Sequence, residues 1–422
     1  MKTRTNRGHR VVITGLGLLT PVGNDVDASW RNLVDGRSGA APITLFDHTD
    51  YDVHFACEVK GFDPVDYMDR KEAKRMDRFA QFAMAVAQQA MDQAGLSSRP
   101  AGVDFDRVGV VIGSGIGGIA TFEDQARTLV ERGPKRISPF FVPMFIPDIA
   151  AGHVSMRFGA RGPNYCTVSA CASSAHAVGD SYRLIEHGDA DVMIAGGTEA
   201  SVTGLTVAGF SNMRALSTRN ESPETASRPF DATRDGFVLG EGAGMLVLES
   251  LEHALARGAT ILGEIIGFGQ SADAYHLTAP APEGAGAQLA MRAVLEGAEL
   301  TVSDVDYINA HGTSTPMNDQ NETLAVKAVF GDAAYDLVMG STKSMTGHLL
   351  GGAGAVEAVI CTKVVGEGVI PPTINFTTQD PICDLNHAHH GRIERPVEVA
   401  MSNSFGFGGH NVCLAVKRWT GE

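Results

Sequence analysis

The chain contains no long apolar run and no excess of positive charge, and both absences exclude classes of protein. No apolar run approaches the roughly 20 residues of a membrane span, so no spanning helix is expected. The first 21 residues begin with basic side chains, but the apolar part is short, interrupted by glycine and without a small-residue cleavage site. These residues therefore indicate a first buried strand and not a signal peptide. The formal net charge of −15 argues against binding nucleic acid through bulk positive potential.

Cysteine is scarce, and its spacing excludes a disulfide framework. The six cysteines form no CxxC pair, which predicts reduced thiols in a cytoplasmic protein, five of them small buried apolar groups. Aromatic residues are only 7% of the chain, but 44% is hydrophobic and 20% is charged, as in ordinary soluble globular proteins. A chain of 422 residues is long enough for two similar halves or two domains.

Glycine, in contrast, is abundant, and it gathers in turns that contain reactive side chains. The 49 glycines sit in short clusters beside apolar runs, which indicates tight turns packed close to a site. Three such turns are TVSACASSAHAVG around Cys171, YINAHGTSTP around His311 and KSMTGHLLGGAG around His348. One thiol and two imidazoles are what carbon–carbon bond formation on thioesters requires, with the thiolate taking an acyl group and the imidazoles managing an enolate.

Cys171 precedes a stretch that favours a helix, which predicts a sulfur at a helix amino terminus. There, free amide protons and the helix dipole favour the thiolate. The alternative is an inert buried thiol, the usual fate of cysteine. Catalysis is favoured because the small neighbours leave room for an acyl chain: Ala170, Ala172, Ser173 and Ser174.

Several polar residues near the histidines are candidates for supporting roles. Lys343 can set the local charge, although an ordinary surface lysine is the alternative. Asp319 and Glu322 can orient the His311 backbone or ring, or can serve as helix-capping acids. The GSGIGG segment at 113–118 lacks the acidic ribose partner of a dinucleotide site, so we interpret it as a close approach beside the site. The histidines of 387–390 lack ordinary ligand spacing, so no catalytic metal is expected.

Short apolar runs alternate with helical patterns, which predicts an α/β fold with mostly parallel sheets. The strands are expected at 10–14, 108–112, 191–195, 244–248, 261–268, 305–309, 337–340, 397–401 and 412–416. The helices are expected at 76–94, 173–187, 284–297 and 349–365. The halves also echo each other: the segments at 10, 108, 164 and 191 match those near 264, 305, 337 and 399. This predicts a duplication, with halves 1–258 and 259–422, in which His348 occupies the turn equivalent to that of Cys171.

Taken together, these segments resemble the elongating β-ketoacyl-acyl-carrier-protein synthases, and specifically the type II enzyme of dissociated fatty acid synthesis. The resemblance runs from VVITGLGLLTPVGN to SNSFGFGGHN and is dense in SRPFDATRDGFVLGEGAG and TKSMTGHLLGGAGAVE. It implies a thiolase-like fold of duplicated halves in a five-layered αβαβα arrangement, and a homodimer. It also implies that no cofactor is required beyond the phosphopantetheine that the acyl carrier protein itself brings.

The resemblance also implies a role for each matching residue. Cys171 looks like the nucleophile that accepts the acyl chain, and His311 and His348 look like the pair that binds the malonyl thioester and promotes loss of carbon dioxide. The backbone amides of Cys171 and Phe407 match the oxyanion site. The remaining matches are Lys343 and Glu322 as supporting residues, Thr313 and Thr315 at the phosphopantetheine arm, Phe407 as the gate, Ile116 and Phe210 at the acyl pocket, and Asn309, Glu357, Ser402 and Asn403 at a structural alkali cation.

Basic residues recur where the family docks its acidic carrier protein, and local positive charge on an acidic chain suits that partner. They are Arg70, Lys71, Lys74, Arg75, Lys135, Arg136 and Arg214. A polyketide ketosynthase shares the same three reactive residues and stays an alternative. So does a non-catalytic partner subunit, although such proteins lose the nucleophile that Cys171 supplies here.

Overall fold

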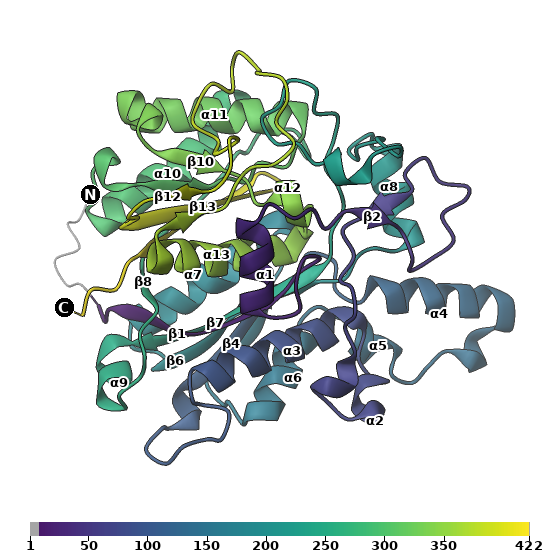
Figure 1. Ribbon diagram of the computed structural model, residues 1–422. Helices are drawn as coiled ribbons and strands as arrows, with labels where there is room; N and C mark the ends of the chain where they lie inside the picture. The colour runs from purple at the N-terminus through teal and green to yellow at the C-terminus, as the bar shows by residue number, and fades with distance from the viewer. Residues whose placement is uncertain (1–7, 422) are drawn as a thin grey trace.

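The computed structural model describes residues 8–421 (Figure 1). Residues 1–7 and 422, which belong to the predicted halves, lie outside the described residues, as does the basic start of the amino-terminal segment. The strands are β1 Val11–Leu19, β2 Ala41–Pro42, β3 Phe55–Ala56, β4 Val108–Gly113, β5 Asn164–Thr167, β6 Val192–Glu199, β7 Gly242–Ser250, β8 Gly263–Ala272, β9 Tyr307–Asn309, β10 Val338–Gly340, β11 Val369–Ile370, β12 Ile393–Glu394, β13 Val399–Gly406 and β14 His410–Lys417.

The helices cover both faces of the sheet and the space between its halves. They are α1 Val26–Val34, α2 Arg70–Ala73, α3 Arg78–Gln93, α4 Ile119–Arg132, α5 Phe141–Phe145, α6 Ile149–Phe158, α7 Ser173–Glu186, α8 Gly204–Asn212, α9 Leu251–Ala256, α10 Ala285–Ala298, α11 Pro316–Phe330, α12 Lys343–Thr346 and α13 Ala353–Glu367. Short 3₁₀ turns include η3 Pro134–Arg136, η4 Ala170–Ala172 and η9 Leu350–Gly352.

Within residues 8–421, ten strands hydrogen-bond into one sheet, and the second five repeat the order of the first five. The order is β10-β9-β13-β14-β8-β1-β7-β6-β4-β5. Read outward from the β1–β8 contact, each side has its first strand, its last strand and then the middle three in the same sequence. All nine expected strands form, and β5 lies at the edge of the sheet.

The expectation of mostly parallel strands is wrong. Of the nine pairings described between the ten strands, four are parallel, β10–β9, β9–β13, β4–β6 and β4–β5, and five are antiparallel. Helix crossovers enforce parallel pairing only among the middle strands of each half. The last strand of each half, β7 or β14, runs antiparallel to both of its neighbours, and the first strands, β1 and β8, run antiparallel to each other. These strands are buried on both faces, so their apolar runs do not reveal their direction.

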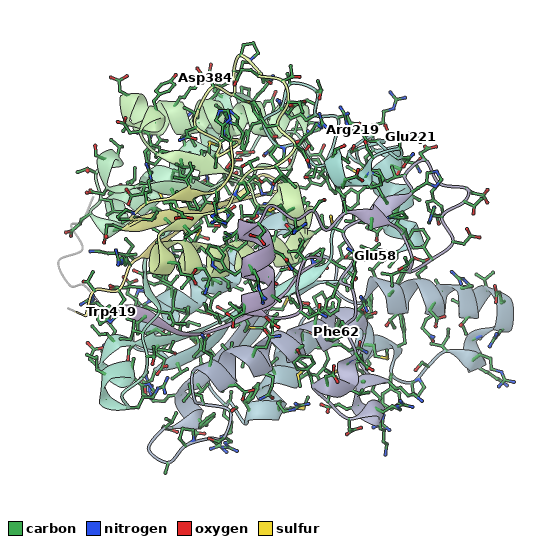
Figure 2. All side chains as sticks on the ribbon, viewed as in Figure 1. Glu58, Phe62, Arg219, Glu221, Asp384 and Trp419 are labelled. Atoms are coloured by element: carbon green, nitrogen blue, oxygen red, sulfur yellow. The ribbon has the colours of Figure 1, made fainter. Side chains whose placement is uncertain are left out.

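The layers explain the placement of the helices (Figure 1). Helices α7 and α13 pack against each other and against strands of both halves, so they form the central layer. Helices α3 and α6 cover the outer face of the first half, and α10 and α11 cover that of the second. Side chains fill the space between these layers (Figure 2). The expected five-layered α/β arrangement is therefore present.

The sequence of α13 explains why it lies in the centre. Its residues from Ala353 to Thr362 are all buried, as expected of a helix that is apolar on every side. Among them, Glu357 is the charged exception. Of the residues described, no helix is both long and apolar enough to cross a membrane.

All six cysteines are free, as expected. Cys166 is only partly buried, against the prediction that it would be a core residue, because it lies on the exposed edge strand β5.

Candidate active site

A cavity of about 590 Å³ lies where the central helices begin, and it brings together residues from both halves. The three reactive residues all line it, although they come from turns separated by up to 177 positions of the chain (171 to 348). Further predicted residues on its wall are Ile116, Phe210, Arg214, Thr313, Thr315, Glu322 and Phe407. The duplicated strand order places the turns before α7 and α13 side by side, since η4 and η9 are in contact.

Cys171 sits in a constrained turn between β5 and α7. It is 9% exposed, and the residue before it, Ala170, has a φ of 51°. This left-handed backbone is strained for a residue with a side chain. The end of β13 packs against this turn, and a Cβ atom at Gly406 would lie 2.6 Å from the Ser169 carbonyl oxygen. Glycine is therefore required where the two halves meet at the sulfur.

Burial raises the pKa of the Cys171 thiol to about 12, although Lys343 lowers it, and so do hydrogen bonds from the amides of Phe407 and of Cys171 itself. The expectation of a favoured thiolate is therefore wrong for this site. Desolvation outweighs the amides, because the sulfur lies inside the fold and not at an open helix end. The same two amides nevertheless converge on the sulfur, as an oxyanion site at the attacked carbonyl requires.

The two imidazoles lie against each other in the cavity. The ring centroids of His311 and His348 are 5.2 Å apart, with the planes nearly perpendicular. His348 also meets the edge of Phe237, and His311 lies 5.6 Å from the ring centre of Phe405. Burial lowers the pKa of both imidazoles well below 6.5, and the charge of Lys343 adds to this. Both rings are therefore neutral at neutral pH, and each has one N–H to donate.

Glu322 holds the His311 turn through the backbone. Its carboxylate accepts hydrogen bonds from the His311 and Gly312 amides, each at 2.8 Å, and from the Asn403 side chain at 3.1 Å. Asp319 instead accepts from the amide of Phe230 at 2.9 Å and lies 3.6 Å from the Arg234 guanidinium. Of the two acids that the sequence singled out, Glu322 touches the histidine turn and Asp319 supports the segment behind it.

Glu322 is expected to make the fold less stable as the pH rises, and Glu322→Gln should remove this dependence. Burial raises the pKa of its carboxyl to about 7 from 4.5, so the folded state binds more protons than the unfolded state in that window. Between about pH 5 and about pH 8, the wild-type free energy of unfolding should fall by up to about 3 kcal/mol more than that of the variant. Urea unfolding at both pH values measures this difference. Glu131→Gln, at the exposed end of α4, is the control, and equal pH dependence in Glu322→Gln and the wild type would contradict the prediction.

Lys343 is a buried residue and not a surface lysine. It is 1% exposed and forms an ion pair with Glu357 of α13. Burial raises the pKa of Glu357 to about 7, and the ammonium opposes that rise. Lys343 also influences the titration of Cys171, His311 and His348, so a single buried charge acts on all three reactive groups.

Four buried oxygens lie at the positions that the resemblance assigns to an alkali cation. Ser402 on β13 is paired in register with Asn309 on β9, next to the strand position of Asn403. Four of the buried oxygens without a hydrogen-bond partner in the described structure belong to these residues: Asn309 Oδ1, Glu357 Oε2, Ser402 Oγ and Asn403 Oδ1. Carboxylate, amide and hydroxyl oxygens are suited to a hard cation.

Glu199, at the end of β6, is a site residue that the sequence interpretation missed. Its fully buried carboxylate accepts from the amides of Gly115 at 2.7 Å, Ile116 at 3.2 Å and Gly351 at 3.0 Å. It thereby joins the wall of the cavity to the turn after His348. An acidic residue ending an all-apolar strand, in DVMIAGGTEA, was the available signal, because an unpaired carboxylate is costly to bury.

The predicted docking residues all lie at the surface. Arg70, Lys71, Lys74 and Arg75 surround α2, Lys135 and Arg136 lie in η3, and Arg214 follows α8 at the cavity wall. The Arg75 guanidinium packs 4.8 Å from the ring centre of Phe140, which joins the α2 run to the turn before α5.

Comparison with known proteins agrees with this geometry. Residues 8–254 match the family profile described as beta-ketoacyl synthase, N-terminal domain, and residues 262–377 match the C-terminal domain. A 3-oxoacyl-[acyl-carrier-protein] synthase 2 of Synechocystis is 52% identical over 97% of this chain and 98% of that protein. The protein of the same name in Staphylococcus aureus is 51% identical over 98% of this chain and 99% of that protein.

Solved structures give the same result at lower identity. A beta-ketoacyl synthase from Burkholderia phymatum has a TM-score of 0.90 at 36% identity, covering 97% of this chain and all of that one. The ishigamide ketosynthase/chain length factor has a TM-score of 0.91 at 34% identity, covering 98% and 100%. A type II polyketide acyl-carrier protein in complex with its ketosynthase has a TM-score of 0.90 at 33% identity, with the same coverage.

The duplicated five-layered fold, with a thiol and two imidazoles where the halves meet, defines a condensing protein of the thiolase-like class. Within that class, the family follows from the matches to both the N-terminal and the C-terminal β-ketoacyl synthase domain, and from relatives whose sequences are more than 50% identical to this chain. The chain belongs to the β-ketoacyl synthase family.

Proposed function

We propose that this chain condenses an acyl group held on Cys171 with malonyl-acyl carrier protein, giving 3-oxoacyl-acyl carrier protein and carbon dioxide in fatty acid elongation. The observation that carries the proposal is the meeting of Cys171, His311 and His348 on one cavity, with the amides of Cys171 and Phe407 at the sulfur. No cofactor is required for this chemistry, since the carrier protein brings the phosphopantetheine arm.

In the first half-reaction, the Cys171 sulfur attacks the carbonyl of the acyl-carrier thioester. The carrier thiol leaves, and the proton of the Cys171 thiol passes to that departing sulfur. Because burial raises the thiol pKa to about 12, this proton is lost only as the new bond forms. Ile116 and Phe210 are partly buried and pack in the same apolar cluster as Cys171, so they would receive the acyl chain.

In the second half-reaction, malonyl-carrier protein loses carbon dioxide, and its thioester oxygen becomes an enolate oxygen. The neutral imidazoles of His311 and His348 donate hydrogen bonds to that oxygen. The enolate carbon then attacks the acyl-Cys171 carbonyl. The amides of Cys171 and Phe407 hold the resulting oxyanion. Its collapse releases the 3-oxoacyl product and expels the Cys171 sulfur, which takes up a proton from solvent and is again a thiol.

The supporting residues fit this sequence of steps. Thr313 and Thr315, whose hydroxyls are 2.9 Å apart on the cavity wall, would meet the phosphopantetheine arm. Phe407 is 37% exposed in the turn between β13 and β14 and would gate the cavity. Asn309, Glu357, Ser402 and Asn403 would hold the alkali cation, which would supply positive charge there.

The carrier protein and a second copy of this chain are the partners we infer. A solved relative is named as an acyl-carrier protein complexed with its ketosynthase, and the relatives above half identity are named as synthases of carrier-bound substrates. The edge strand β5 supports a homodimer, since its outer edge is unpaired in the described residues and the side chains of Tyr165, on it, and Val168, directly after it, are exposed. A duplication divided at residue 258 and a cytoplasmic location stay predictions.

A polyketide ketosynthase is the second candidate, because solved polyketide ketosynthases share the fold. Fatty acid elongation is favoured, since the curated synthases are 51–52% identical and the polyketide structures 33–34%.

The test is incubation of the purified protein with acyl-carrier thioesters of several lengths and malonyl-carrier protein, followed by intact mass and carbon dioxide release. Acylation at Cys171 and a product two carbons longer are expected. Repeated extension without release of a single 3-oxo product would favour the polyketide alternative. A folded protein that no thioester acylates would contradict the proposal and favour a non-catalytic partner subunit.

A further inference from the structure

The turn that carries His311 also carries the two threonines proposed for the carrier arm, and its backbone is strained. His311, Thr313 and Thr315 line the cavity, while Ser314 between them is fully buried with a φ of 69°. A residue with a side chain is strained in this left-handed region, so surrounding contacts must hold it there. The Ser314 hydroxyl accepts from the Arg228 amide at 2.9 Å, and its carbonyl accepts from the Gly236 amide at 3.2 Å.

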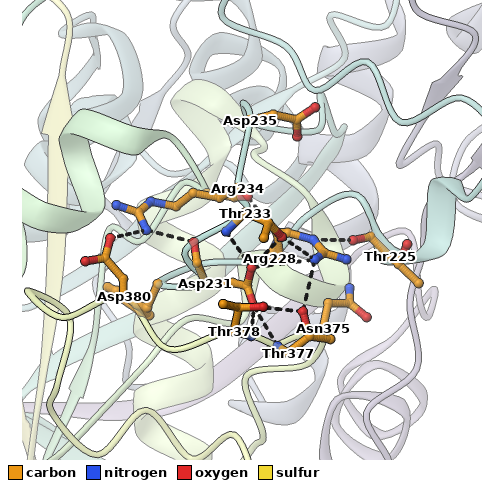
Figure 3. A network of polar contacts seen from close by, with 12 residues as sticks. Thr225, Arg228, Asp231, Thr233, Arg234, Asp235, Asn375, Thr377, Thr378 and Asp380 are labelled. Carbon is orange, nitrogen blue, oxygen red and sulfur yellow. Dashed lines mark hydrogen bonds and ion pairs between the residues drawn. The ribbon is translucent and has the colours of Figure 1, made fainter.

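Arg234 binds the carboxyl end of this turn, and Figure 3 shows its contacts on the far side, to Asp231 and Asp380. Its guanidinium, 2% exposed, donates to the carbonyl oxygens of Thr315 at 3.1 Å and Pro316 at 2.9 Å. It also donates to the Asp231 carbonyl at 2.8 Å and to the Asp380 carboxylate at 2.8 Å. The planar fork of arginine thereby fixes four acceptors at once, which no lysine can do.

The acceptors on the far side of Arg234 are themselves anchored. Asp380 Oδ1 accepts from the Ile382 amide at 3.0 Å. The buried Asp231 carboxylate accepts from the amides of Thr377 and Thr378, each at 2.6 Å (Figure 3). The turn is therefore tied through Arg234 to the segment around residues 377–382, and not only to the strand β9 that precedes it.

Arg234 also joins two walls of the cavity. The three residues that follow it, Asp235, Gly236 and Phe237, line the cavity beside the threonine turn, since the Gly236 amide donates to the Ser314 carbonyl, whereas Arg234 itself does not line it. If residues that position a substrate are displaced by about 1 Å, the rate of the reaction can fall by about 10²-fold.

From these contacts we infer that Arg234 is a positioning residue, which fixes Thr313 and Thr315 to receive the phosphopantetheine arm of the carrier-bound thioester. The inference rests on the proposed function and deepens it. Arg234 touches no reacting atom, and its effect is confined to substrates that carry the arm.

Arg228 provides a matched control. It has the same 6% exposure as Arg234 and lies in the same polar network (Figure 3). In the described part of the chain, its guanidinium donates to Thr225, Thr233 and Thr377, lies 3.6 Å from the Asp231 carboxylate, and binds no residue of the threonine turn. Replacing its side chain leaves in place the hydrogen bond from the Arg228 backbone amide to the Ser314 hydroxyl. Arg228→Met therefore removes an equally buried arginine without releasing the carbonyls of residues 315 and 316.

The experiment measures acylation of Cys171 by intact mass with two substrates, an acyl-carrier protein and the ethyl thioester of the same acid, which lacks the arm. Arg234→Met should raise KM for the carrier-bound substrate about tenfold or more, while kcat/KM for the ethyl thioester changes by less than about twofold. Arg228→Met should leave the ratio of the two substrates at the wild-type value. Arg234→Lys keeps the positive charge without the planar guanidinium, and it should show the same selective rise in KM. This second variant tests the inference even if Arg234→Met does not fold.

Equal losses with both substrates in the Arg234 variants would overturn the inference, because the residue would then support the fold or the nucleophile. The same selective loss in Arg228→Met would overturn it too. Wild-type protein that neither thioester acylates would refute the proposed function itself, a result distinct from either of these.

Discussion

Cys171→Ala abolishes condensation but leaves slow decarboxylation of malonyl-carrier protein. The thiol is the acceptor of the acyl group, so its loss should lower the rate of 3-oxoacyl formation by at least about 10³-fold. Loss of carbon dioxide needs only the enolate to be stabilised, and the neutral rings of His311 and His348 remain in the variant. Intact mass after incubation with acyl-carrier protein measures acylation, and carbon dioxide release measures decarboxylation.

Cys166→Ala is the control for this experiment. Cys166 is a partly buried thiol five positions away, on β5, and burial raises its pKa to about 12, as for Cys171. Its removal should leave acylation and condensation unchanged. Two results would contradict the assignment: acyl mass that persists in Cys171→Ala, or decarboxylation that disappears with condensation in a variant that melts like the wild type.

The arrangement of reactive residues could be predicted from the sequence because each stands in a turn of small residues between a strand and a helix. The similarity between the sequence segments around Cys171 and His348 placed these two residues in equivalent turns. In the structure, both residues line one cavity with His311. The order of the strands follows the same echo. Repetition fixes which segments correspond even where the direction of a single strand is ambiguous.

The electrostatics could not be predicted, because they depend on burial by distant segments. The sequence allowed Lys343 to lie at the surface, and only the packing of α13 beside it shows the buried pair with Glu357. The same desolvation reverses the expected shift of the Cys171 pKa. Arg234 had no reactive neighbour in the sequence, since Thr315 and Asp380 approach it only in the fold.

His311→Ala and His348→Ala are each expected to slow malonyl decarboxylation by about 10²–10³-fold, the cost of removing one donor from a stabilised oxyanion. The ring centroids are 5.2 Å apart on one cavity, so both N–H groups can reach a single enolate oxygen. Carbon dioxide release from malonyl-carrier protein measures the loss. His153→Ala is the control, a partly buried histidine on α6 outside the cavity, and it should keep the wild-type rate.

The double variant distinguishes a shared oxygen from two separate tasks. If both imidazoles stabilise the same enolate, removing the second donor should cost much less than the first, because groups that act as a unit are not additive. Losses that multiply would assign the two rings to different steps and contradict the shared-oxygen mechanism. Acylation of Cys171 in His311→Ala should stay near the wild-type rate, since that step forms no enolate, so an equal loss of acylation would also count against the mechanism.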